Sequence, residues 1–233
     1  MRILALITAR GGSKRLPGKN LRLLGGSPLI LWSINIAKDI PEVVDILVTT
    51  DDSEIAEVSK SAGALVPWLR PPELATDTAS SVDVCLHAIK WYEEEKGKVD
   101  GVMLLQPTSP FRRRSKILQG IKVFSSHQHR PLVGVSKAES HPMRCFNIED
   151  GSLCPLIKGE GVSMRTQELP PVYVVNGSFY LIAPEDLRKQ RSFYKGDLIP
   201  LLAEDPKEGL DIDTKWDWMI AEAVVQAGLS PDP

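Results

Sequence analysis

A glycine-rich basic loop close to the amino terminus is the first stretch of this chain whose residue types could do chemistry. The residues before it, Met1 to Thr8, are mostly apolar and predict a short buried strand. Glycines in the segment that follows let the backbone turn tightly and approach a ligand, while arginines and lysines can donate hydrogen bonds to phosphate oxygens. This composition predicts a phosphate ligand. The cations are Arg10, Lys14, Arg15 and Lys19, and the glycines are Gly11, Gly12 and Gly18.

The loop departs from the two best-known phosphate-binding fingerprints. Five residues separate Gly12 from Gly18, where the Gly-x4-Gly-Lys-Ser/Thr loop has four, and Asn20 follows Lys19 where that loop has a hydroxyl. The dinucleotide pattern Gly-x-Gly-x-x-Gly is also missing. A solvated basic turn is the simpler alternative, but the apolar strand before the loop favours a central position. We therefore expect phosphate binding through a different loop chemistry.

Two aspartates near the carboxyl terminus, Asp211 and Asp213, are separated by one apolar residue. In extended chain both carboxylates point to the same side, where like charges repel. A hard divalent cation such as Mg²⁺ would relieve the repulsion and would match the phosphate-binding loop. The alternative is that Asp213 or Thr214 caps the last helix. The spacing alone leaves both interpretations open, and the basic loop favours the metal.

Gln106 is the candidate for orienting a polar substrate. It ends an unbroken apolar strand predicted over 100–106, and its amide can donate and accept hydrogen bonds without changing its charge. It could instead tie down the loop over 107–112. Arg144 and Arg165 lie in an irregular region, where an exposed arginine is by default solvated. Because no Ser/His/Asp or Cys/His arrangement falls at strand ends, covalent catalysis is not expected.

Strands and helices alternate through most of the chain, which predicts a doubly wound, mostly parallel α/β sheet. Ligands of such sheets bind at the carboxyl ends of the strands, and the charged loops fall there. Ser27 followed by Pro28 predicts a helix N-cap and first helical position, and 51–53 and Ser80–Ser81 predict two further caps. Strands are expected at 1–8, 43–50, 64–66, 100–106, 132–136, 172–182 and 198–203, and helices at 28–37, 53–60, 82–96, 115–126, after Pro184 and at 216–227.

The alternation breaks between residues 139 and 171. Glycine, proline and short apolar pieces there predict a β-hairpin that leaves the sheet, so we interpret 139–171 as an arm inserted in a single domain spanning 1–233. An arm of this kind often contacts a partner subunit, and we expect a homodimer, although a lid over the site would have the same pattern. After the arm, Asn176-Gly177 would ordinarily indicate a hairpin turn. Because the strand pattern continues on both sides, Gly177 instead marks a close approach of backbone and ligand.

The composition of the chain excludes several classes of protein. Its 233 residues are 42% apolar, enough for one large α/β domain. A net charge of -2 gives no overall attraction to nucleic acid, so the first loop is expected to bind a small anion. Three cysteines without metal-ligand spacing, and the lack of a signal-peptide pattern, favour a reduced cytoplasmic protein. No stretch approaches the roughly 18 apolar residues of a membrane span, so no membrane partner is expected.

With these residues collected, the sequence resembles the acylneuraminate cytidylyltransferases, also called CMP-sialic acid synthetases. The resemblance covers essentially the whole chain. It rests on Ala9–Asn20, Arg70–Ser81, Leu105–Arg112, His141-Pro142, Asn176–Tyr180 and Leu210–Thr214. It implies a Rossmann-like fold similar to that of the nucleotide-diphospho-sugar transferases. It also implies transfer of CMP from CTP to the anomeric hydroxyl of a 2-keto-3-deoxy sugar acid, with Mg²⁺ and release of pyrophosphate.

The same resemblance implies roles for individual side chains. Arg10 and Lys19 would hold the triphosphate, Gln106 would orient the sugar, and Asp211 and Asp213 would bind the metal. The other residues of the implied nucleotide site are Gly11, Gly12, Ser13, Asn20, Arg70 and Ser81, and those of the implied sugar site are Arg144, Arg165 and Asn176. In-line attack at the α-phosphorus needs alignment and charge neutralisation more than a strong base. We therefore expect the catalytic residues to be Arg10, Lys19, Gln106 and Asp211.

Two positions depart from the family pattern. Thr8 replaces the proline common before Ala-Arg, and Arg165 is followed by Thr166 where the family often has a second arginine. Enzymes for the shorter Kdo sugar resemble this chain less in the first loop, so we expect a nine-carbon nonulosonic acid such as N-acetylneuraminic, legionaminic or pseudaminic acid. The competing hypotheses are a nucleotidyltransferase for a Kdo-type acid or a sugar phosphate, and a non-catalytic nucleotide-binding module.

Overall fold

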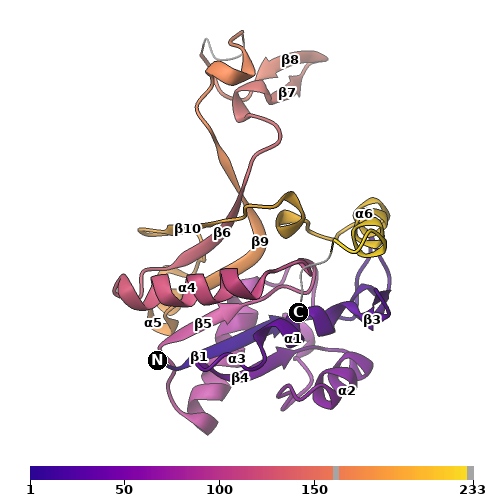
Figure 1. Ribbon diagram of the computed structural model, residues 1–233, viewed down its shortest axis with the longest axis vertical. Coiled ribbons are helices and arrows are strands. Elements are labelled where there is room, and N and C mark those ends of the chain that lie inside the picture. The colour runs from indigo at the N-terminus through magenta and orange to yellow at the C-terminus, as the bar shows by residue number, and fades with distance from the viewer. Residues whose placement is uncertain (160–162, 230–233) are drawn as a thin grey trace.

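A six-stranded sheet of order β10-β6-β9-β5-β1-β4 lies at the centre of the computed structural model, which describes residues 1–159 and 163–229 (Figure 1). Its strands are β1 (Ile3–Thr8), β4 (Val43–Thr49), β5 (Gly101–Leu104), β6 (Leu132–Lys137), β9 (Tyr173–Ile182) and β10 (Ile199–Leu202). The pairs β1–β4, β1–β5 and β6–β10 run parallel, and β9 runs antiparallel to both β5 and β6. The predicted mostly parallel α/β fold is confirmed.

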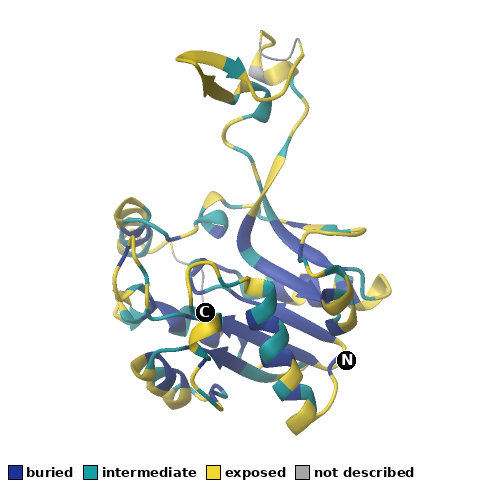
Figure 2. Cartoon of the chain, turned by 180° about the vertical axis from the view of Figure 1, so that it is seen from behind, coloured by how far each residue is buried: buried dark blue, intermediate teal, exposed yellow. Residues whose placement is uncertain are grey.

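Alternate residues of β1 face two separate cores. The α-helices are α1 (Leu29–Ala37), α2 (Ser53–Ser61), α3 (Ser81–Lys96), α4 (Arg114–Ser126), α5 (Pro184–Gln190) and α6 (Lys215–Gln226). Ile3, Ala5 and Ile7 pack with α1, α2 and α4, whereas Leu4 and Leu6 pack with α3 and α5. Because helices cover both faces, β1 is apolar at nearly every position and fully buried at five of its six residues (Figure 2). In the described residues, no helix combines the length and apolar character needed to cross a bilayer.

A third, smaller apolar cluster joins the two ends of the chain. Leu16 of the first loop, Phe111 of the loop after β5, and Ile212 and Trp218 near the carboxyl terminus are each at most 1% exposed and pack together. Parallel strands β1 and β5 deliver the first two segments to the same edge of the sheet. The cluster then holds the segment before α6 against them, so residues about 200 positions apart in sequence become neighbours.

The predicted cap at Ser27 and Pro28 is wrong. These two residues form β3 (Ser27–Pro28), which pairs antiparallel with β2 (Leu23–Leu24), and α1 begins at Leu29. The turn between the two short strands consists of Gly25 and Gly26, which both have positive φ. Two glycines of this conformation make a tight hairpin turn, and the resulting strand pairing replaces the expected side-chain cap. Asp52 and Ser80, by contrast, cap α2 and α3 as predicted.

The strand predicted over 64–66 is reduced to an isolated bridge. Leu65 pairs with Leu47 of β4, and its amide donates to the Ile46 carbonyl at 2.8 Å. Beyond this contact the chain turns into an irregular segment that contains the short helix η2 (Pro72–Leu74). This segment returns to the carboxyl ends of the strands, because the Arg70 amide donates to the Thr50 carbonyl at 2.6 Å.

Of the arm predicted at 139–171, residues 160–162 lie outside the described residues, and the rest leaves the sheet between β6 and β9 and rises away from the rest of the molecule (Figure 1). Strands β7 (Phe146–Glu149) and β8 (Ser152–Pro155) form a hairpin whose turn residues, Asp150 and Gly151, both have positive φ. Short helices η3 (Pro142–Arg144) and η5 (Thr166–Glu168) flank this hairpin. Contact of the arm with a partner subunit stays a prediction.

Strand β9 passes straight through Asn176-Gly177, as expected from the strand pattern on either side. Val133 of β6 pairs with Tyr180 and Val135 pairs with Val175, so β9 carries a bulge between these two pairs. Gly177 adopts φ +74° within the bulge. This conformation favours glycine and turns the local backbone toward the loop after β5.

Candidate active site

A cavity of about 460 Å³ lies at the carboxyl ends of β1 and β5. Its lining combines the first loop with segments from the middle and the end of the chain, as the sequence predicted. The predicted residues that line it are Arg10, Ser13, Lys19, Asn20, Arg70, Ser81, Gln106 and Asp213. The basic amino-terminal loop and one of the two carboxyl-terminal aspartates therefore face the same cavity.

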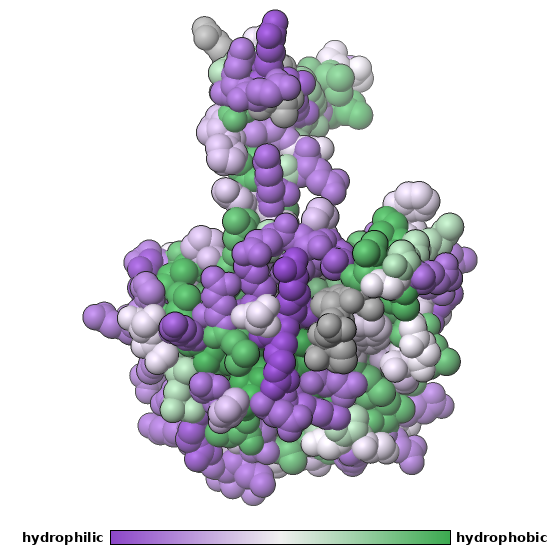
Figure 3. Space-filling view, in the orientation of Figure 1, coloured by the Kyte–Doolittle hydropathy of each residue, from purple (hydrophilic) through white to green (hydrophobic). Residues whose placement is uncertain are grey.

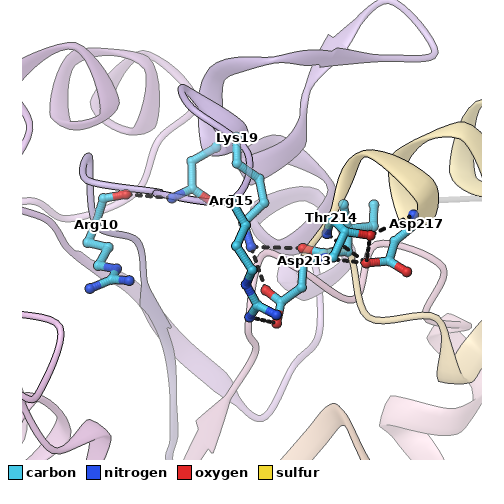
Figure 4. Close-up of polar contacts among 8 residues, drawn as sticks. Arg10, Arg15, Lys19, Asp213, Thr214 and Asp217 are labelled. Carbon is cyan, nitrogen blue, oxygen red and sulfur yellow. Dashed lines mark hydrogen bonds and ion pairs between the residues drawn. The ribbon is translucent and has the colours of Figure 1, made fainter.

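Lys19 connects the first loop directly to the aspartate segment (Figure 4). Its ammonium donates to the Ile212 carbonyl at 2.8 Å and to the Asp213 carboxylate at 2.9 Å, and its side chain is only 11% exposed. Arg15 donates to the second carboxylate oxygen of Asp213 at 2.5 Å. The Ile212 amide donates to the Thr108 carbonyl at 2.8 Å. These bonds hold the Asp-Ile-Asp segment between the first loop and the loop after β5.

The capping alternative for this segment applies to Thr214 and not to Asp213. Thr214 is the N-cap of α6, and Asp217 completes a capping box with it. The Asp217 carboxylate accepts hydrogen bonds from the amides of Asp213 at 3.0 Å and Thr214 at 2.7 Å. The helix start is thus satisfied by other groups, and the Asp213 side chain turns toward the cations of the first loop (Figure 4).

The two other cations of the loop pair with Asp77, a residue that the sequence did not single out. Arg10 lies 2.7 Å from one carboxylate oxygen of Asp77, and Lys14 pairs with the other oxygen. Hydrogen bonds from Lys14 and Arg10 lower the pKa of the Asp77 carboxyl below its usual range. Asp77 lies in the 70–81 segment, but no spacing within that segment signalled the pairing.

Asn20 and Arg70 shape the cavity through backbone contacts. Asn20 is 5% exposed, and its amide donates to the Arg10 carbonyl at 2.9 Å. Arg70 is 6% exposed and donates to the carbonyl and the hydroxyl of Thr49 at the end of β4. Burial lowers the pKa of the Arg70 guanidinium, and nearby Asp51 opposes that shift. Both side chains are therefore held in place before any ligand binds.

Gly11 and Gly12 lie on the outer side of the first loop. They line a separate open hollow of about 430 Å³, which also includes Arg10, Lys14 and Asp77. The Gly11 amide donates to the Asp51 carboxylate at 3.0 Å, and a Cβ at Gly11 would lie 2.6 Å from an Asp52 oxygen. Gly11 is thus needed because its backbone lies close to Asp52. From the sequence we had expected a close approach of this backbone to the ligand instead.

A second cavity, of about 840 Å³, adjoins the first along the bulge of β9. Gln106 lines both cavities, whereas Asn176 and Asp211 line the larger one. The Asn176 amide donates to the Ser136 hydroxyl at 2.9 Å. A Cβ at Gly177 would lie 2.9 Å from the side-chain oxygen of Gln106. The bulge therefore packs against the residue that stands between the two cavities.

Arg112 supports Gln106 from behind and was also missed from the sequence. It is 5% exposed and donates to the Gln106 carbonyl at 2.6 Å, to the Ser33 hydroxyl at 3.0 Å and to the Ser178 carbonyl. Burial lowers the pKa of its guanidinium to about 9, and the charge of Asp211 opposes that shift. The residue thus keeps its positive charge at neutral pH and ties α1, the loop after β5 and β9 together.

Asp211 and Asp213 are the carboxylates that could hold a hard divalent cation, which would have to displace Arg15 and Lys19 from the two oxygens of Asp213. Asp211 is exposed at the edge of the larger cavity, but the protein atoms around it still raise the pKa of its carboxyl by partial loss of hydration. The charge of Asp213 adds to this effect, whereas the Thr108 hydroxyl and Lys19 oppose it. Two carboxylates that repel each other match the oxygen ligands that Mg²⁺ prefers. Within 1–159 and 163–229, no group of three or more His, Cys, Asp or Glu residues could hold a metal. Further ligands would have to come from a bound phosphate or from water.

The structure does not bring Arg144 and Arg165 to either cavity of their own chain. Both lie in the arm, which β6 and β9 carry away from the sheet (Figure 1). Arg144 donates to the Met164 carbonyl at 2.6 Å, and the Arg165 amide donates to the Glu168 carboxylate at 3.1 Å. The expectation that they share a sugar site with Gln106 is therefore not met within one chain.

Comparisons with known proteins point to one family. Residues 4–138 match the model of the family described as Cytidylyltransferase. The "CMP-N,N'-diacetyllegionaminic acid synthase" of Legionella pneumophila is 38% identical to this chain over 227 residues, which cover 97% of both proteins. The "N-acylneuraminate cytidylyltransferase" of Streptococcus agalactiae is 32% identical over 222 residues, which cover 94% of this chain. Those residues cover 52% of the streptococcal relative, so this chain spans about half of its length.

Among solved structures, the fold is similar to that of a CMP:2-keto-3-deoxy-manno-octonic acid synthetase complexed with CTP. The TM-score is 0.72, and the match covers 98% of this chain and 100% of the other. The two sequences are 16% identical, so this likeness shows the fold alone.

Proposed function

We infer the activity from one premise: this chain belongs to the cytidylyltransferase family. Its resemblance to the CMP-sialic acid synthetases is confirmed by the relatives that share it over nearly its whole length. We propose that it transfers CMP from CTP to the anomeric hydroxyl of a nonulosonic acid and releases pyrophosphate. The observation that carries the proposal is the pair of adjoining cavities, one bordered by the basic loop and the other by Asp211, with Gln106 between them.

The smaller cavity is suited to CTP. Arg10 and Lys19 offer the charge and hydrogen bonds that the triphosphate requires. Arg70 and Ser81 line another part of the same cavity, where they would contact the nucleoside, as would Asn20. Four cations of the first loop already have carboxylate partners, so the phosphates would replace these carboxylates on binding.

The larger cavity is suited to the sugar acid. Its volume of about 840 Å³ falls within the range of about 300–1,000 Å³ that is usual for small-molecule sites. Gln106 and Asn176 would position the sugar by hydrogen bonds, with Gln106 directing the anomeric hydroxyl toward the α-phosphorus. Arg112 would maintain that geometry because it binds the Gln106 backbone from the buried side. The groups that would align the two substrates are then already in place before either substrate binds.

Asp211 and Asp213 would hold Mg²⁺ together with phosphate oxygens of CTP. When bound, the ion would neutralise charge on the α-phosphate and lower the pKa of the attacking hydroxyl. The side chains of Arg10 and Lys19 would stabilise the negative charge that develops on the departing pyrophosphate. The proton of the anomeric hydroxyl would leave toward Asp211, which lines the sugar cavity.

The sugar acid that we propose first is N,N'-diacetyllegionaminic acid. The Legionella relative is named for the CMP derivative of that acid and matches 97% of this chain at 38% identity. N-acetylneuraminic and pseudaminic acids are the alternatives within the same class. The three cysteines are free, which fits the reducing cytoplasm that we infer as the compartment.

We further propose that the arm joins two subunits. Its hairpin exposes large apolar side chains, and apolar surface is visible at the end of the arm (Figure 3). Among these side chains, Phe146, Ile148 and Leu153 are 40%, 77% and 68% exposed. A second copy of the chain would cover this surface. Arg144 and Arg165 lie on the same arm, so they could reach a sugar acid only in the cavity of the other subunit.

The test is an acceptor panel. The protein is incubated with CTP, Mg²⁺ and N,N'-diacetyllegionaminic, N-acetylneuraminic, pseudaminic or Kdo acid, and pyrophosphate and CMP-sugar are measured. We expect equal amounts of both products with at least one nine-carbon acid, and little product when UTP or GTP replaces CTP. Silence of the folded protein with every acid would reject the proposal. Turnover of a sugar 1-phosphate would favour the competing nucleotidyltransferase hypothesis. CTP binding without any turnover would favour the non-catalytic nucleotide-binding module.

A further inference from the structure

Each cation of the first loop is paired with one of two carboxylates in the structure. Asp213 pairs with Arg15 and Lys19, and Asp77 pairs with Arg10 and Lys14. Asp213 belongs to the proposed metal site and is held by the backbone bonds of Ile212. Asp77 has no role in the proposed reaction, so its position needs a separate explanation.

Asp77 pairs with two of the cations that the proposed function assigns to the phosphate loop. It lines both the nucleotide cavity and the open hollow on the outer side of the first loop, as do Arg10 and Lys14. Its carboxylate uses one oxygen for each of these cations. Its side chain is 43% exposed and belongs to the irregular segment between η2 and α3, so little packing opposes its movement.

We propose that Asp77 is a resident counter-anion of the phosphate loop, which competes with the triphosphate for Arg10 and Lys14 and takes them back as pyrophosphate leaves. This inference rests on the proposed function. A polyphosphate carries several negative charges and displaces a single carboxylate, but it must first break two ion pairs. Asp77 therefore weakens the binding of CTP and of pyrophosphate, and it favours release of the product.

The opposite role would be that Asp77 organises Arg10 and Lys14 for the ligand. The two roles differ in the sign of one measurement. If Asp77 competes, its removal tightens polyphosphate binding, whereas if it organises the cations, its removal weakens binding. The open hollow beside the loop is lined by Arg10, Lys14 and Asp77, so pyrophosphate that leaves through it would pass the same residues.

The experiment measures binding of pyrophosphate, and separately of CTP, by isothermal titration calorimetry with Mg²⁺ and no sugar acid. The variants are Asp77→Asn, which removes the charge, and Asp77→Glu, which keeps it. Asp197→Asn is the matched control, because Asp197 pairs with Arg130 at 2.5 Å and lies outside both cavities. We expect Asp77→Asn to bind pyrophosphate about three- to tenfold more tightly, the range that two exposed ion pairs allow. Asp77→Glu and Asp197→Asn should bind like the unchanged protein.

Affinity that is unchanged or weaker in Asp77→Asn would overturn the inference. An equal gain in Asp197→Asn would also overturn it, since the effect would then reflect net charge alone. Failure of the unchanged protein to bind CTP has a different meaning, because it would contradict the proposed function. Circular dichroism and thermal unfolding of each variant distinguish a change in affinity from a loss of folded protein.

Discussion

At the scale of single residues, the site depends on carboxylates that lie close to cations or to one another. Asp213 and Asp77 each bind two cations of the first loop, while Asp211 lines the larger cavity with a raised carboxyl pKa. The sequence alone identified Asp211 and Asp213 as candidate site residues, because they are only two positions apart in the chain. Asp77 and Arg112 could not be identified in this way, because their partners are distant in sequence and only folding brings them together.

Replacing Asp211 by asparagine keeps the shape of the side chain and removes its charge. We expect the rate of CMP-sugar formation to fall by about 100-fold or more, since charge stabilisation at a reacting phosphate is typically worth that much. Binding of CTP to the smaller cavity should persist, because Lys19 and Arg10 are unchanged. Coupled pyrophosphate detection and calorimetry measure the two quantities. Asp83→Asn, at an exposed pair with Arg191, serves as the control, and full activity of Asp211→Asn would remove the proposed metal role.

The buried cysteine provides a prediction about pH. Burial raises the pKa of the Cys85 thiol to about 12, so at pH 8 the group is a neutral thiol and not the reactive thiolate. Because the folded-state pKa lies above the usual value of 9.0, the neutral form stabilises the fold, and this contribution is lost as the pH rises from about 9 toward 12. Native protein treated with iodoacetamide at pH 8 should be unmodified at Cys85 by peptide mapping. If Cys85 of the native protein were modified as fast as in protein unfolded by urea, the buried face of α3 would be accessible to solvent and the prediction would be wrong.

Among the helices and strands, the alternation was predictable because it follows from the local periodicity of apolar residues. Strand β1 is apolar throughout since both of its faces are covered, and Asp52 and Ser80 cap helices by bonds to their own neighbours. The exceptions have nonlocal causes. Ser27 and Pro28 form a strand because β2 is there to pair with, and the bulge of β9 depends on its register with β6.

The bulge of β9 makes Gly177 a critical position for both stability and activity. Alanine there would carry a φ of +74° and would place its Cβ 2.9 Å from the Gln106 side-chain oxygen. We expect Gly177→Ala to lose about 1–2 kcal/mol of unfolding free energy from the backbone strain and, in addition, to lower kcat by displacing Gln106. Urea unfolding and steady-state kinetics measure the two effects.

Gly63→Ala is the matched control for that variant. Gly63 has φ +88° just after the end of α2, outside both cavities and the arm, and no atom lies within 4 Å of the position that its Cβ would take. It should show a similar backbone cost and unchanged kcat. If both variants reduced kcat equally, the contact between the bulge and Gln106 would not matter to the reaction.

At the scale of the whole molecule, the third apolar cluster is what brings the two ends of the chain to one cavity. Leu16, Phe111 and Ile212 come from three distant segments and are almost completely buried together. The sequence predicted that the basic loop and the aspartates converge, because both fall at the carboxyl ends of strands or follow them. It could not predict that Arg144 and Arg165 lie far from the cavity, because their distance depends on how far β6 and β9 extend beyond the sheet.

The arm provides a prediction about assembly. Ile148 is 77% exposed and Leu153 is 68% exposed on a hairpin that projects from the sheet. Placing aspartate at both positions should convert a dimer into a monomer, because two charges would be buried in the contact between subunits. Light scattering at micromolar concentration measures the mass. A monomeric mass for the unchanged protein, or a dimeric mass for the double variant, would contradict the proposed role of the arm.

The convergence of the basic loop and the two aspartates on one triphosphate is tested most directly by a crystal structure of the protein with CTP and Mg²⁺. We expect the triphosphate on Arg10 and Lys19, with Asp211 and Asp213 holding the ion. We also expect Asp77 to have moved away from Arg10. A triphosphate bound outside the 460 Å³ cavity, or an ion bound without either aspartate, would contradict this convergence.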